Sequence, residues 1–202
     1  MSKKNMASAE KTAHKGAMHA LLDYVEMFVF TVAAVILLLS FFFRLCVVSG
    51  PSMNNTLLNG EKLIVSNLFY TPDTGDIIVF HQTSDTNDKF NEPIVKRVIA
   101  TEGEFVKIDY VQNKVYVSAD NVFEENEVLQ EDYIIPGKPS YLPHAQNVFV
   151  YEVPAGHLFV MGDNRPVSAD SRYGAVEFVD ERRVLGKVLF RVTPFNKFGK
   201  VG

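Results

Sequence analysis

The chain has 202 residues, enough for one globular domain, and its 47% hydrophobic and 12% aromatic residues exclude an intrinsically disordered protein. Residues 49–202 carry 15 Lys and Arg against 21 Asp and Glu, a net charge of −6. A surface this acidic excludes a general nucleic-acid-binding protein, so no nucleic acid is expected among the partners.

An apolar segment, MFVFTVAAVILLLSFFF, covers residues 27–43 without a charged side chain. As an α-helix it would span roughly 26 Å. Continuation through LCVV, with Arg44 reaching toward the headgroups, brings the length to the ~30 Å of a hydrocarbon core. We expect a transmembrane anchor over 27–48, preceded by a tail of residues 1–26. A helix buried in a protein core is the alternative, but no other segment offers it a helical partner.

Bulky residues end the apolar segment, whereas a cleavable signal would have small residues there, so the anchor is expected to stay in place. Four lysines lie within residues 1–26, and a single cation, Arg44, lies on the other side. Because Lys and Arg favour the cytoplasmic side, we expect a single-pass protein of the plasma membrane with a cytoplasmic N-terminus and residues 49–202 outside. Cys46 is the only cysteine, so no intrachain disulfide is possible.

Short segments rich in Val, Ile, Phe and Tyr follow the anchor, and turn residues separate them, which is typical of an antiparallel β domain. The sequence DYVQNKVYV (109–117) indicates a hairpin that turns at Gln112 and Asn113. The predicted fold class is therefore mainly β, with one N-terminal transmembrane helix. The expected strands are 61–65, 76–80, 94–100, 104–109, 114–118, 147–153, 157–161, 175–179 and 184–192.

Residues 119–146 are acidic, contain prolines and show little periodicity, which indicates an insertion at the surface with lower order. Within the extracytoplasmic domain, 49–202, we therefore expect an inserted β subdomain over 103–156. The catalytic or binding core would be formed by residues 49–102 and 157–202.

The sequence SGPSM (49–53) places Ser52 after Gly50, which permits unusual dihedrals, and after Pro51, whose φ is fixed. This arrangement can hold a hydroxyl in a set geometry, although most serines beside Gly and Pro are turn residues. A serine nucleophile needs a base. The histidines at positions 81, 144 and 157 lie in no recognisable triad motif, yet their number leaves a Ser-His-Asp site open.

Lys96 lies in PIVKRVIA (93–100), which is typical of a strand. Adjacent residues of a strand point to opposite faces, so one of the two cations Lys96 and Arg97 is expected to point inward. Burial lowers the pKa of a lysine, which allows the neutral amine to act as a base. The alternative is an ordinary strand lysine whose ammonium extends to solvent.

The sequence MGDNRPVSADSRYG (161–174) gathers carboxylates, an amide, two arginines and two serines after an apolar strand. Asp163, Asn164 and Asp170 are residue types that ligate calcium, but the spacing and the distal Glu of a calcium loop are missing, and the arginines would repel a cation. We expect ion pairs and turn hydrogen bonds that hold the loop, with no metal and no other cofactor.

Taken together and in order, these stretches resemble the signature boxes of the type I signal peptidases. The boxes are SGPSMNNTLLNGEKLIV (49–65), GDIIVF (75–80), KRVIATEGE (96–104) and MGDNRPVSADSRYG, and they follow an N-terminal anchor. Members of this family are membrane-anchored Ser/Lys proteases that remove signal peptides from exported preproteins, and the short single-anchor form is similar to the Gram-positive bacterial members. The resemblance covers the anchor and most of the core, though not residues 119–146.

The resemblance implies roles for particular residues. Ser52 matches the nucleophile and Lys96 the general base, which takes the hydroxyl proton as a neutral amine and later activates the deacylating water. Ser168 matches a serine whose hydroxyl orients the lysine. The residues that match supports of the loop are Asp163, Asp170 and Arg172.

Two positions depart from the family pattern. The backbone N–H of Ser52 is the implied oxyanion donor, and some relatives add a hydroxyl two residues earlier, where this chain has Gly50. The second donor is therefore left open between a water molecule and none. Asn55 stands where the pattern S-M-x-P-T has proline, which is expected to loosen the backbone without removing a reactive group.

The resemblance also implies that the substrate lies as an extended strand between residues 47–51 and 92–95, with small side chains at the positions one and three before the cut. The implied partners are the signal peptides of secreted preproteins, the lipid bilayer and the protein translocation machinery. The implied substrate-binding residues are Gly50, Pro51, Met53, Ile94 and Val95.

Two other functions stay open at this stage. A membrane-tethered β domain without catalytic activity could bind an exported partner, and it would tolerate the loss of the Ser52 hydroxyl. A related Ser/Lys protease could cleave itself or a regulatory protein, but such relatives lack the anchor.

Overall fold

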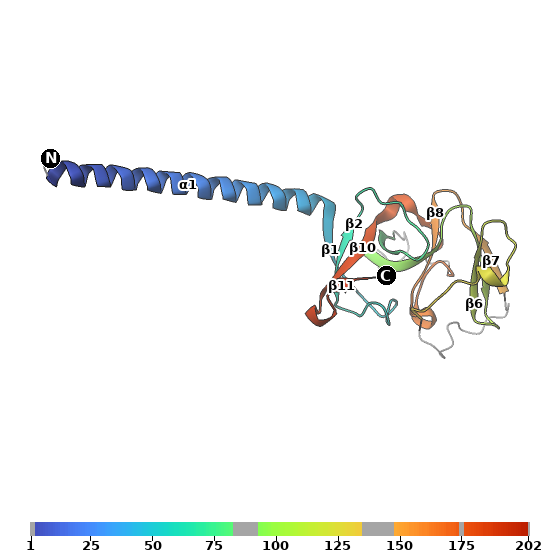
Figure 1. The fold of residues 1–202 in the computed structure, drawn as a ribbon. Helices are drawn as coiled ribbons and strands as arrows, with labels where there is room; N and C mark the ends of the chain where they lie inside the picture. The colour runs from blue at the N-terminus through green and yellow to red at the C-terminus, as the bar shows by residue number, and fades with distance from the viewer. Residues whose placement is uncertain (1–2, 83–92, 135–147, 174–175, 202) are drawn as a thin grey trace. The chain divides into compact units, whose positions relative to one another are not determined.

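The computed structural model describes residues 3–82, 93–134, 148–173 and 176–201 (Figure 1). The chain divides into two units after Phe42. The first unit is a helix, and the second is a β domain.

The helix, α1, covers Lys3–Phe42. Its segment Met18–Phe42 is long and apolar enough to cross a membrane, and none of that window is buried inside the protein. The expected apolar helix is therefore present, but it ends at Phe42 and not at residue 48. Phe43–Val47 form strand β1, because their backbone groups pair with strand β2. Arg44 consequently lies in a strand and not at the end of the anchor.

The β domain contains two sheets, and every pairing among the described strands is antiparallel, as the sequence predicted. The larger sheet has the order β1-β2-β10-β3-β4-β8-β9, with β11 paired to β10, and the smaller has the order β6-β5-β7. The further strands of the larger sheet are β2 (Lys62–Ser66), β3 (Ile77–His81), β4 (Pro93–Ala100), β8 (His157–Met161), β9 (Val179–Asp180), β10 (Val184–Thr193) and β11 (Gly199–Lys200). The strands of the smaller sheet are β5 (Phe105–Asp109), β6 (Lys114–Ser118) and β7 (Val148–Glu152).

Single-turn helices connect some of these strands. They are η2 (Glu125–Glu127), η3 (Arg165–Val167), η4 (Glu181–Arg183) and η5 (Phe195–Lys197). Of these, η3 lies in the loop that follows β8, which the sequence singled out for its charged residues.

The strand expected at 175–179 is wrong. Only Val179–Asp180 are extended there, as the short β9. The backbone N–H groups of Val176 and Glu177 both donate to the carbonyl of Tyr173, which closes a turn. Glu177 also has a φ of 54°, which a continuous strand does not allow.

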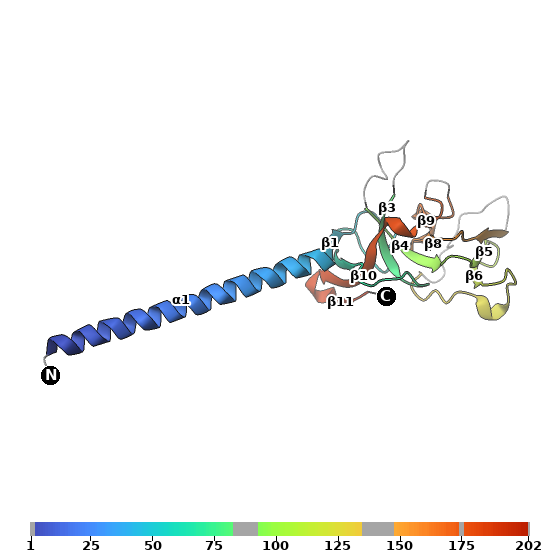
Figure 2. The same ribbon diagram turned by 90° about the horizontal axis from the view of Figure 1, so that it is seen from above.

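The smaller sheet is formed entirely by residues of the expected inserted subdomain, 103–156. Its β5–β6 hairpin pairs Asp109 with Lys114, so the turn contains the expected Gln112 and Asn113, and Asn113 has the positive φ of 58°. Figure 2 shows β5 and β6 beside β4 and β8, at the end of the larger sheet that lies far from β1. The subdomain therefore adjoins the strands that carry the candidate site.

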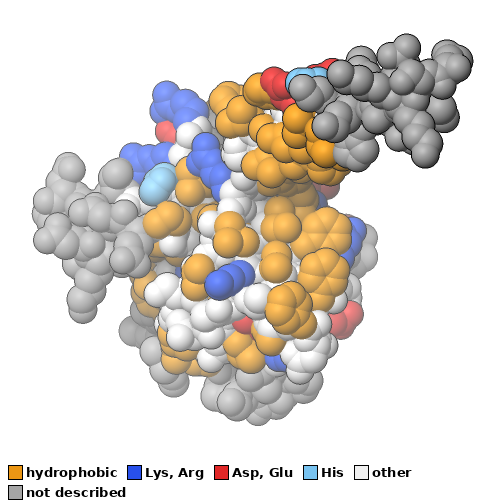
Figure 3. Space-filling view, turned by 90° about the vertical axis from the view of Figure 1, so that its left-hand side faces the viewer, with side chains coloured by type: hydrophobic (Ala, Val, Ile, Leu, Met, Phe, Trp, Pro, Cys, Tyr) orange, Lys and Arg blue, Asp and Glu red, His pale blue; other side chains and the backbone are white. Residues whose placement is uncertain are grey.

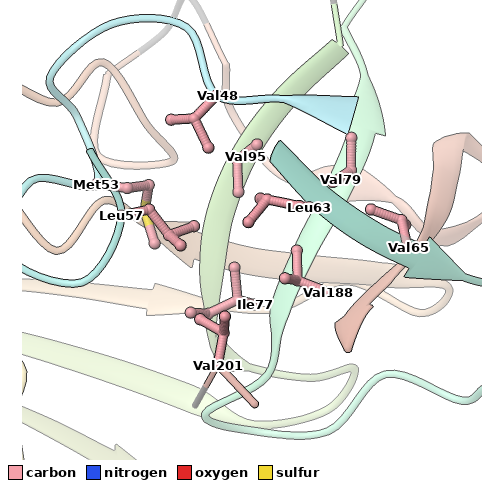
Figure 4. Close-up of a cluster of buried hydrophobic side chains, with 10 residues drawn as sticks. All are labelled: Val48, Met53, Leu57, Leu63, Val65, Ile77, Val79, Val95, Val188 and Val201. Carbon is pink, nitrogen blue, oxygen red and sulfur yellow. The ribbon is translucent and has the colours of Figure 1, made fainter. Parts of the chain in front are cut away.

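One buried hydrophobic cluster lies under the turn that contains Ser52 (Figure 4). Met53 and Leu57, from this turn, are 1% and 0% exposed and pack with residues of β2, β3, β4 and β10. The other members are Val48, Leu63, Val65, Ile77, Val79, Val95, Val188 and Val201. Met53, the residue after Ser52, and Leu57 are thus fixed in the core. Ser52 is therefore held against the sheet.

Candidate active site

Ser52 and Lys96 meet although 44 residues separate them. Lys96 lies in β4, where it pairs with Ile78 of β3, and its side chain is buried. The Nζ atom of Lys96 lies 2.8 Å from Oγ of Ser52 and 3.1 Å from the carbonyl oxygen of Val95. These are hydrogen-bond distances, so the amine can exchange a proton with the hydroxyl directly.

Burial lowers the pKa of Lys96 to about 8, because the charged ammonium is removed from water. The carboxylates of Asp170 and Asp163 oppose this shift by favouring the ammonium, while the nearby Arg172 adds to it. The net result is an amine that loses its proton about 2.5 pH units below the ordinary 10.5 of lysine. A base of this kind is partly neutral near physiological pH.

Arg97 points to the opposite face of β4 and is also buried, at 4% exposure. The sequence predicted one inward cation, and the structure has two, because both faces of this strand are covered. The guanidinium forms a bidentate pair with Asp163, at 2.9 Å from Nε and 2.8 Å from Nη2, and Nη1 donates to the carbonyl of Gly75 at 2.8 Å. The ion pair compensates the charge of Arg97 inside the protein.

The loop after β8 holds the turn that contains Ser52. The backbone N–H of Asn164 donates to the carbonyl of Ser52 at 3.0 Å, and its side-chain amide donates to the carbonyl of Pro51, also at 3.0 Å. On the other side, the N–H of Gly50 donates to Oδ1 of Asn59 at 2.9 Å. Among the described residues, the N–H of Ser52 has no hydrogen-bond partner. It is therefore available to a developing oxyanion.

Gly162 allows this close approach of loop and turn. A Cβ atom at this position would lie 2.3 Å from Oγ of Ser168 and 2.4 Å from the carbonyl oxygen of Ser52. Ser168 is thus near Ser52, and its hydroxyl is buried without a hydrogen bond to any described residue. The structure places Ser168 beside the site, and its orienting contact with Lys96 stays a prediction.

The predicted loop supports Asp163, Asp170 and Arg172 all take part in buried contacts. Asp170 accepts hydrogen bonds from Nε and Nη2 of Arg172 at 2.7 and 2.9 Å, and from the N–H of Gly162 at 3.0 Å. Arg172 also donates to the carbonyl of Arg165 at 2.8 Å. Asp163 joins the loop to β4 through Arg97. Within the described residues, no three His, Cys, Asp or Glu side chains gather in a way that could hold a metal ion.

A cavity of about 130 Å³ opens beside the Ser52–Lys96 pair. Three of the predicted substrate-binding residues line it, namely Met53, Ile94 and Val95, whereas Gly50 and Pro51 do not. The remaining lining residues are Val48, Ser49, Ser52, Pro93 and Lys96. The predicted substrate segment 92–95 begins one residue outside the described part of the chain.

Asn55 does not loosen the backbone as expected. Its φ is 96°, a conformation that proline cannot adopt, and its side-chain amide donates to the carbonyl of Tyr133 at 2.8 Å. The turn after Ser52 is thus tied to a segment 78 residues away. A local pattern cannot reveal a partner so distant along the chain.

A family model described as signal peptidase, peptidase S26, matches residues 21–193 of the chain. The chain therefore belongs to the signal peptidase family. It is a serine endopeptidase of the signal peptidase I type.

Relatives in Synechocystis and Staphylococcus aureus agree with this assignment. The chain is 34% identical over 165 residues to a probable signal peptidase I-1 of Synechocystis. The matched residues cover 77% of this chain and 74% of the relative. It is 36% identical over 160 residues to signal peptidase IB of Staphylococcus aureus, over 75% of this chain and 78% of the relative. A solved structure of a signal peptidase I from Enterococcus faecalis V583 is 29% identical and covers 58% of this chain and 97% of its own, with a TM-score of 0.42.

Proposed function

We propose that the chain cleaves signal peptides from exported preproteins, with Ser52 as nucleophile and Lys96 as general base. The observation that carries the proposal is the 2.8 Å contact between Nζ of Lys96 and Oγ of Ser52. Burial of the amine supports the same role, because it lowers the pKa of Lys96 to about 8. The described residues bring no histidine into this contact.

In the first half of the reaction, the neutral amine of Lys96 accepts the proton of the Ser52 hydroxyl as Oγ attacks the scissile carbonyl. The resulting ammonium can protonate the leaving amine of the mature protein. In the second half, Lys96 takes a proton from water as the water attacks the acyl-enzyme; the ester bond to Oγ of Ser52 then breaks, the ammonium of Lys96 returns the proton to Oγ, and the signal peptide is released. A single base thus serves both steps.

The tetrahedral intermediates carry an oxyanion that needs hydrogen-bond donors. The N–H of Ser52 supports this role, since it has no partner among the described residues. The turn that presents it is fixed by Asn164 and Asn59. Gly50 offers no side-chain donor, so a water molecule is the candidate for a second one.

The cavity beside Ser52 favours small side chains next to the cut. Its volume of about 130 Å³ fits alanine-sized groups better than large ones, and Met53 and Ile94 offer them apolar contacts within a lining that also contains polar side chains. We infer cleavage after Ala-X-Ala-like sites, with the substrate backbone extended along the residues that precede Ser52 and Lys96.

A membrane location fits the apolar window of α1 and the membrane-anchored character of the family. We propose a single pass with the N-terminus in the cytoplasm. Figure 3 shows a face of the β domain on which several hydrophobic side chains are exposed. In the β domain, neighbouring elements carry exposed apolar side chains, namely Leu45 and Val47 in β1, Phe190 in β10, and Phe195 and Phe198 in and after η5. These side chains are candidates for contact with lipid. Contact with the translocation machinery is the further proposal that export implies.

The test is cleavage of a preprotein with an Ala-X-Ala site by the full-length enzyme in detergent. Ser52→Ala and Lys96→Ala should each abolish cleavage, because one removes the nucleophile and the other the base. Lys62→Ala, which changes an exposed lysine of β2, should cleave like the parent. Mass spectrometry of the products locates the cut.

Normal cleavage by Lys96→Ala would reject the dyad. If neither the parent nor any variant cleaves, and the parent still binds the preprotein, the alternative of a membrane-tethered binding domain is favoured.

A further inference from the structure

Glu131 and Tyr133 lie within the predicted insertion 119–146, yet they contact the catalytic core. The side chain of Glu131 is buried and Tyr133 is half-buried, and the two residues reach two different arginines there. We call these two residues the brace.

Glu131 compensates the most deeply buried large cation of the core. Arg165 is 1% exposed and forms an ion pair with the Glu131 carboxylate, whose side chain is 7% exposed. Nε of Arg165 donates to the carbonyl of Gly162 at 3.1 Å. Gly162 is followed by the loop whose Asn164 holds the carbonyl of Ser52. Glu131 therefore stabilises the conformation of the loop that fixes the nucleophile.

Tyr133 contacts the cation next to the general base. The guanidinium carbon of Arg97 lies 3.9 Å from the centroid of the Tyr133 ring, and the guanidinium carbon of Arg165 lies 5.9 Å from the same centroid. Burial raises the pKa of Tyr133, and the Glu131 carboxylate adds to the shift, so the hydroxyl keeps its proton. The hydroxyl donates to Oε1 of Glu131 at 3.1 Å. The ring thus covers the Arg97–Asp163 pair on the face of β4 opposite Lys96.

Asn55 completes the connection. Asn55 follows three residues after Ser52, and its side-chain amide donates to the carbonyl of Tyr133 at 2.8 Å. Next to it, the hydroxyl of Thr56 donates to Asp163. The backbone of the brace is therefore joined to the turn of the nucleophile, while its side chains are joined to β4 and to the loop after β8.

We propose that Glu131 and Tyr133 are positioning residues of the peptidase, which hold the Ser52 turn, β4 and the loop after β8 in the arrangement that catalysis needs. This inference rests on the proposed function. It assigns to the insertion a direct part in the geometry of the Ser52–Lys96 pair, through contacts with residues of the core and without contact to the substrate.

The brace should also act on the proton equilibrium of Lys96. The charged groups that face this amine are Asp163, Asp170 and Arg172. If the ring of Tyr133 is removed, the guanidinium of Arg97 loses the contact that holds it beside Asp163. It then compensates the negative charge of Asp163 less well. The carboxylate then favours the ammonium form of Lys96 more strongly, so the pKa of Lys96 rises and activity appears at higher pH.

The experiment compares Tyr133→Leu with Asp132→Asn in the full-length enzyme in detergent, with a preprotein as substrate. Asp132 is exposed, and its side chain makes none of the contacts above, so its variant is the matched control. For Tyr133→Leu we expect kcat to fall about tenfold at unchanged KM. We also expect the midpoint of the pH profile of kcat/KM to rise by about half a unit.

Two smaller changes separate positioning from loss of folding. Tyr133→Phe keeps the ring over Arg97 and removes the hydroxyl, and Asn55→Gly keeps the positive φ and removes the amide. Each removes one hydrogen bond that holds the ring in place and leaves the ring itself, so each should lower kcat by a smaller factor than Tyr133→Leu and raise the midpoint by less. If Tyr133→Leu does not fold, as judged by its melting temperature, these two variants decide.

The proposal is overturned if kcat and the midpoint of Tyr133→Leu equal those of Asp132→Asn. It is also overturned if activity falls only in proportion to the folded fraction while the midpoint stays in place, since that is a structural role alone. In both cases the parent still cleaves. Absence of cleavage by the parent rejects the proposed function itself, and with it the role of the brace.

Discussion

At the scale of single residues, burial decides which form of Lys96 can act. Loss of water around the ammonium lowers the pKa of this group, and the carboxylates of Asp170 and Asp163 limit the shift. A neutral amine next to a hydroxyl is a base, whereas an ammonium in the same place is not. The 2.8 Å contact between Nζ of Lys96 and Oγ of Ser52 therefore allows the amine to accept the hydroxyl proton only at a pH where the amine is neutral.

The first prediction concerns this pH dependence. Lys96 must lose its proton before it can accept that of Ser52, so kcat/KM should rise with pH through a midpoint near the pKa of about 8. The midpoint lies below the 10.5 of an ordinary lysine because the folded protein disfavours the charged form. Initial rates of preprotein cleavage between mildly acidic and alkaline pH measure it. A flat profile would contradict Lys96 as the base.

A second residue-scale prediction concerns Gly162. A methyl group there would lie 2.4 Å from the carbonyl oxygen of Ser52, which cannot move without moving the nucleophile. Gly162→Ala should therefore lower kcat about 100-fold and the free energy of unfolding by about 1–3 kcal/mol. Cleavage rates and melting temperatures measure the two effects.

The control for Gly162→Ala is a double variant. Adding Ser168→Ala removes the clash with Oγ of Ser168 but leaves those with Cβ of residue 168 and with the carbonyl of Ser52, so cleavage should stay well below that of the single variant Ser168→Ala. Full recovery in the double variant would show that the hydroxyl alone, and not the position of the nucleophile, is sensitive at this site.

At the scale of elements, the turn after Ser52 is stabilised by partners on both sides. Met53 and Leu57 are buried in the core below it, and Asn164 binds its carbonyls from the loop after β8. Asn55 then ties its end to Tyr133. The turn is short and irregular, yet each of these contacts limits its motion, which suits a nucleophile that must be preorganised.

This arrangement makes a prediction about proline at position 55. Proline fixes φ near −65°, whereas Asn55 has a φ of 96°. Asn55→Pro should therefore force the turn to rearrange, with a loss of about 3 kcal/mol in the free energy of unfolding. Asn55→Gly, which accepts a positive φ, should lose less. Thermal unfolding of the two variants provides the comparison, and equal stability of Asn55→Pro and the parent would argue against the turn described here.

At the scale of the whole molecule, the proposed membrane anchor and the proposed nucleophile lie close together in the chain. The apolar window of α1 ends at Phe42, and β1 begins at the next residue. Ser52 follows ten residues after the end of the helix. By chain length alone, its backbone can lie no more than about 35 Å from that end. With α1 as the proposed membrane anchor, we expect the scissile bond to be cut close to the membrane surface.

The proposed topology can be tested in intact cells with epitope tags at the two ends of the chain. Four lysines before the apolar window Met18–Phe42 favour the cytoplasm for the N-terminus. A C-terminal tag should therefore react with a membrane-impermeant reagent, and an N-terminal tag should react only after the membrane is opened. The opposite pattern would contradict the orientation, and reaction of both tags would contradict the single pass.

The sequence was sufficient where the signal is local. Segments rich in Val, Ile, Phe and Tyr, separated by turn residues, predicted most strands, and the ordered motifs around Ser52 and Lys96 pointed to this pair. It was harder to predict that both cations of β4 are buried, because burial of Arg97 depends on Asp163 from a distant loop. Strand β1 was missed because its residues continue the apolar run of the anchor, and only pairing with β2 identifies it.

The brace was missed for a related reason. Residues 119–146 look irregular and polar, which is typical of a surface insertion. Glu131 and Tyr133 gain their importance only from Arg165, Arg97 and Asn55, all of which lie far away in the chain. Contacts between residues so far apart in the chain are set by the fold and produce no periodic pattern in the sequence.

Cys46 gives the molecule a built-in probe. It is the single cysteine of the chain and lies half-buried in β1, packed against the cluster that also contains Met53. Burial raises the pKa of its thiol, so alkylating reagents should reach it slowly near neutral pH. A fluorophore or spin label at this thiol would report, without any engineered cysteine, on the strand that links the anchor to the nucleophile while a preprotein is being processed.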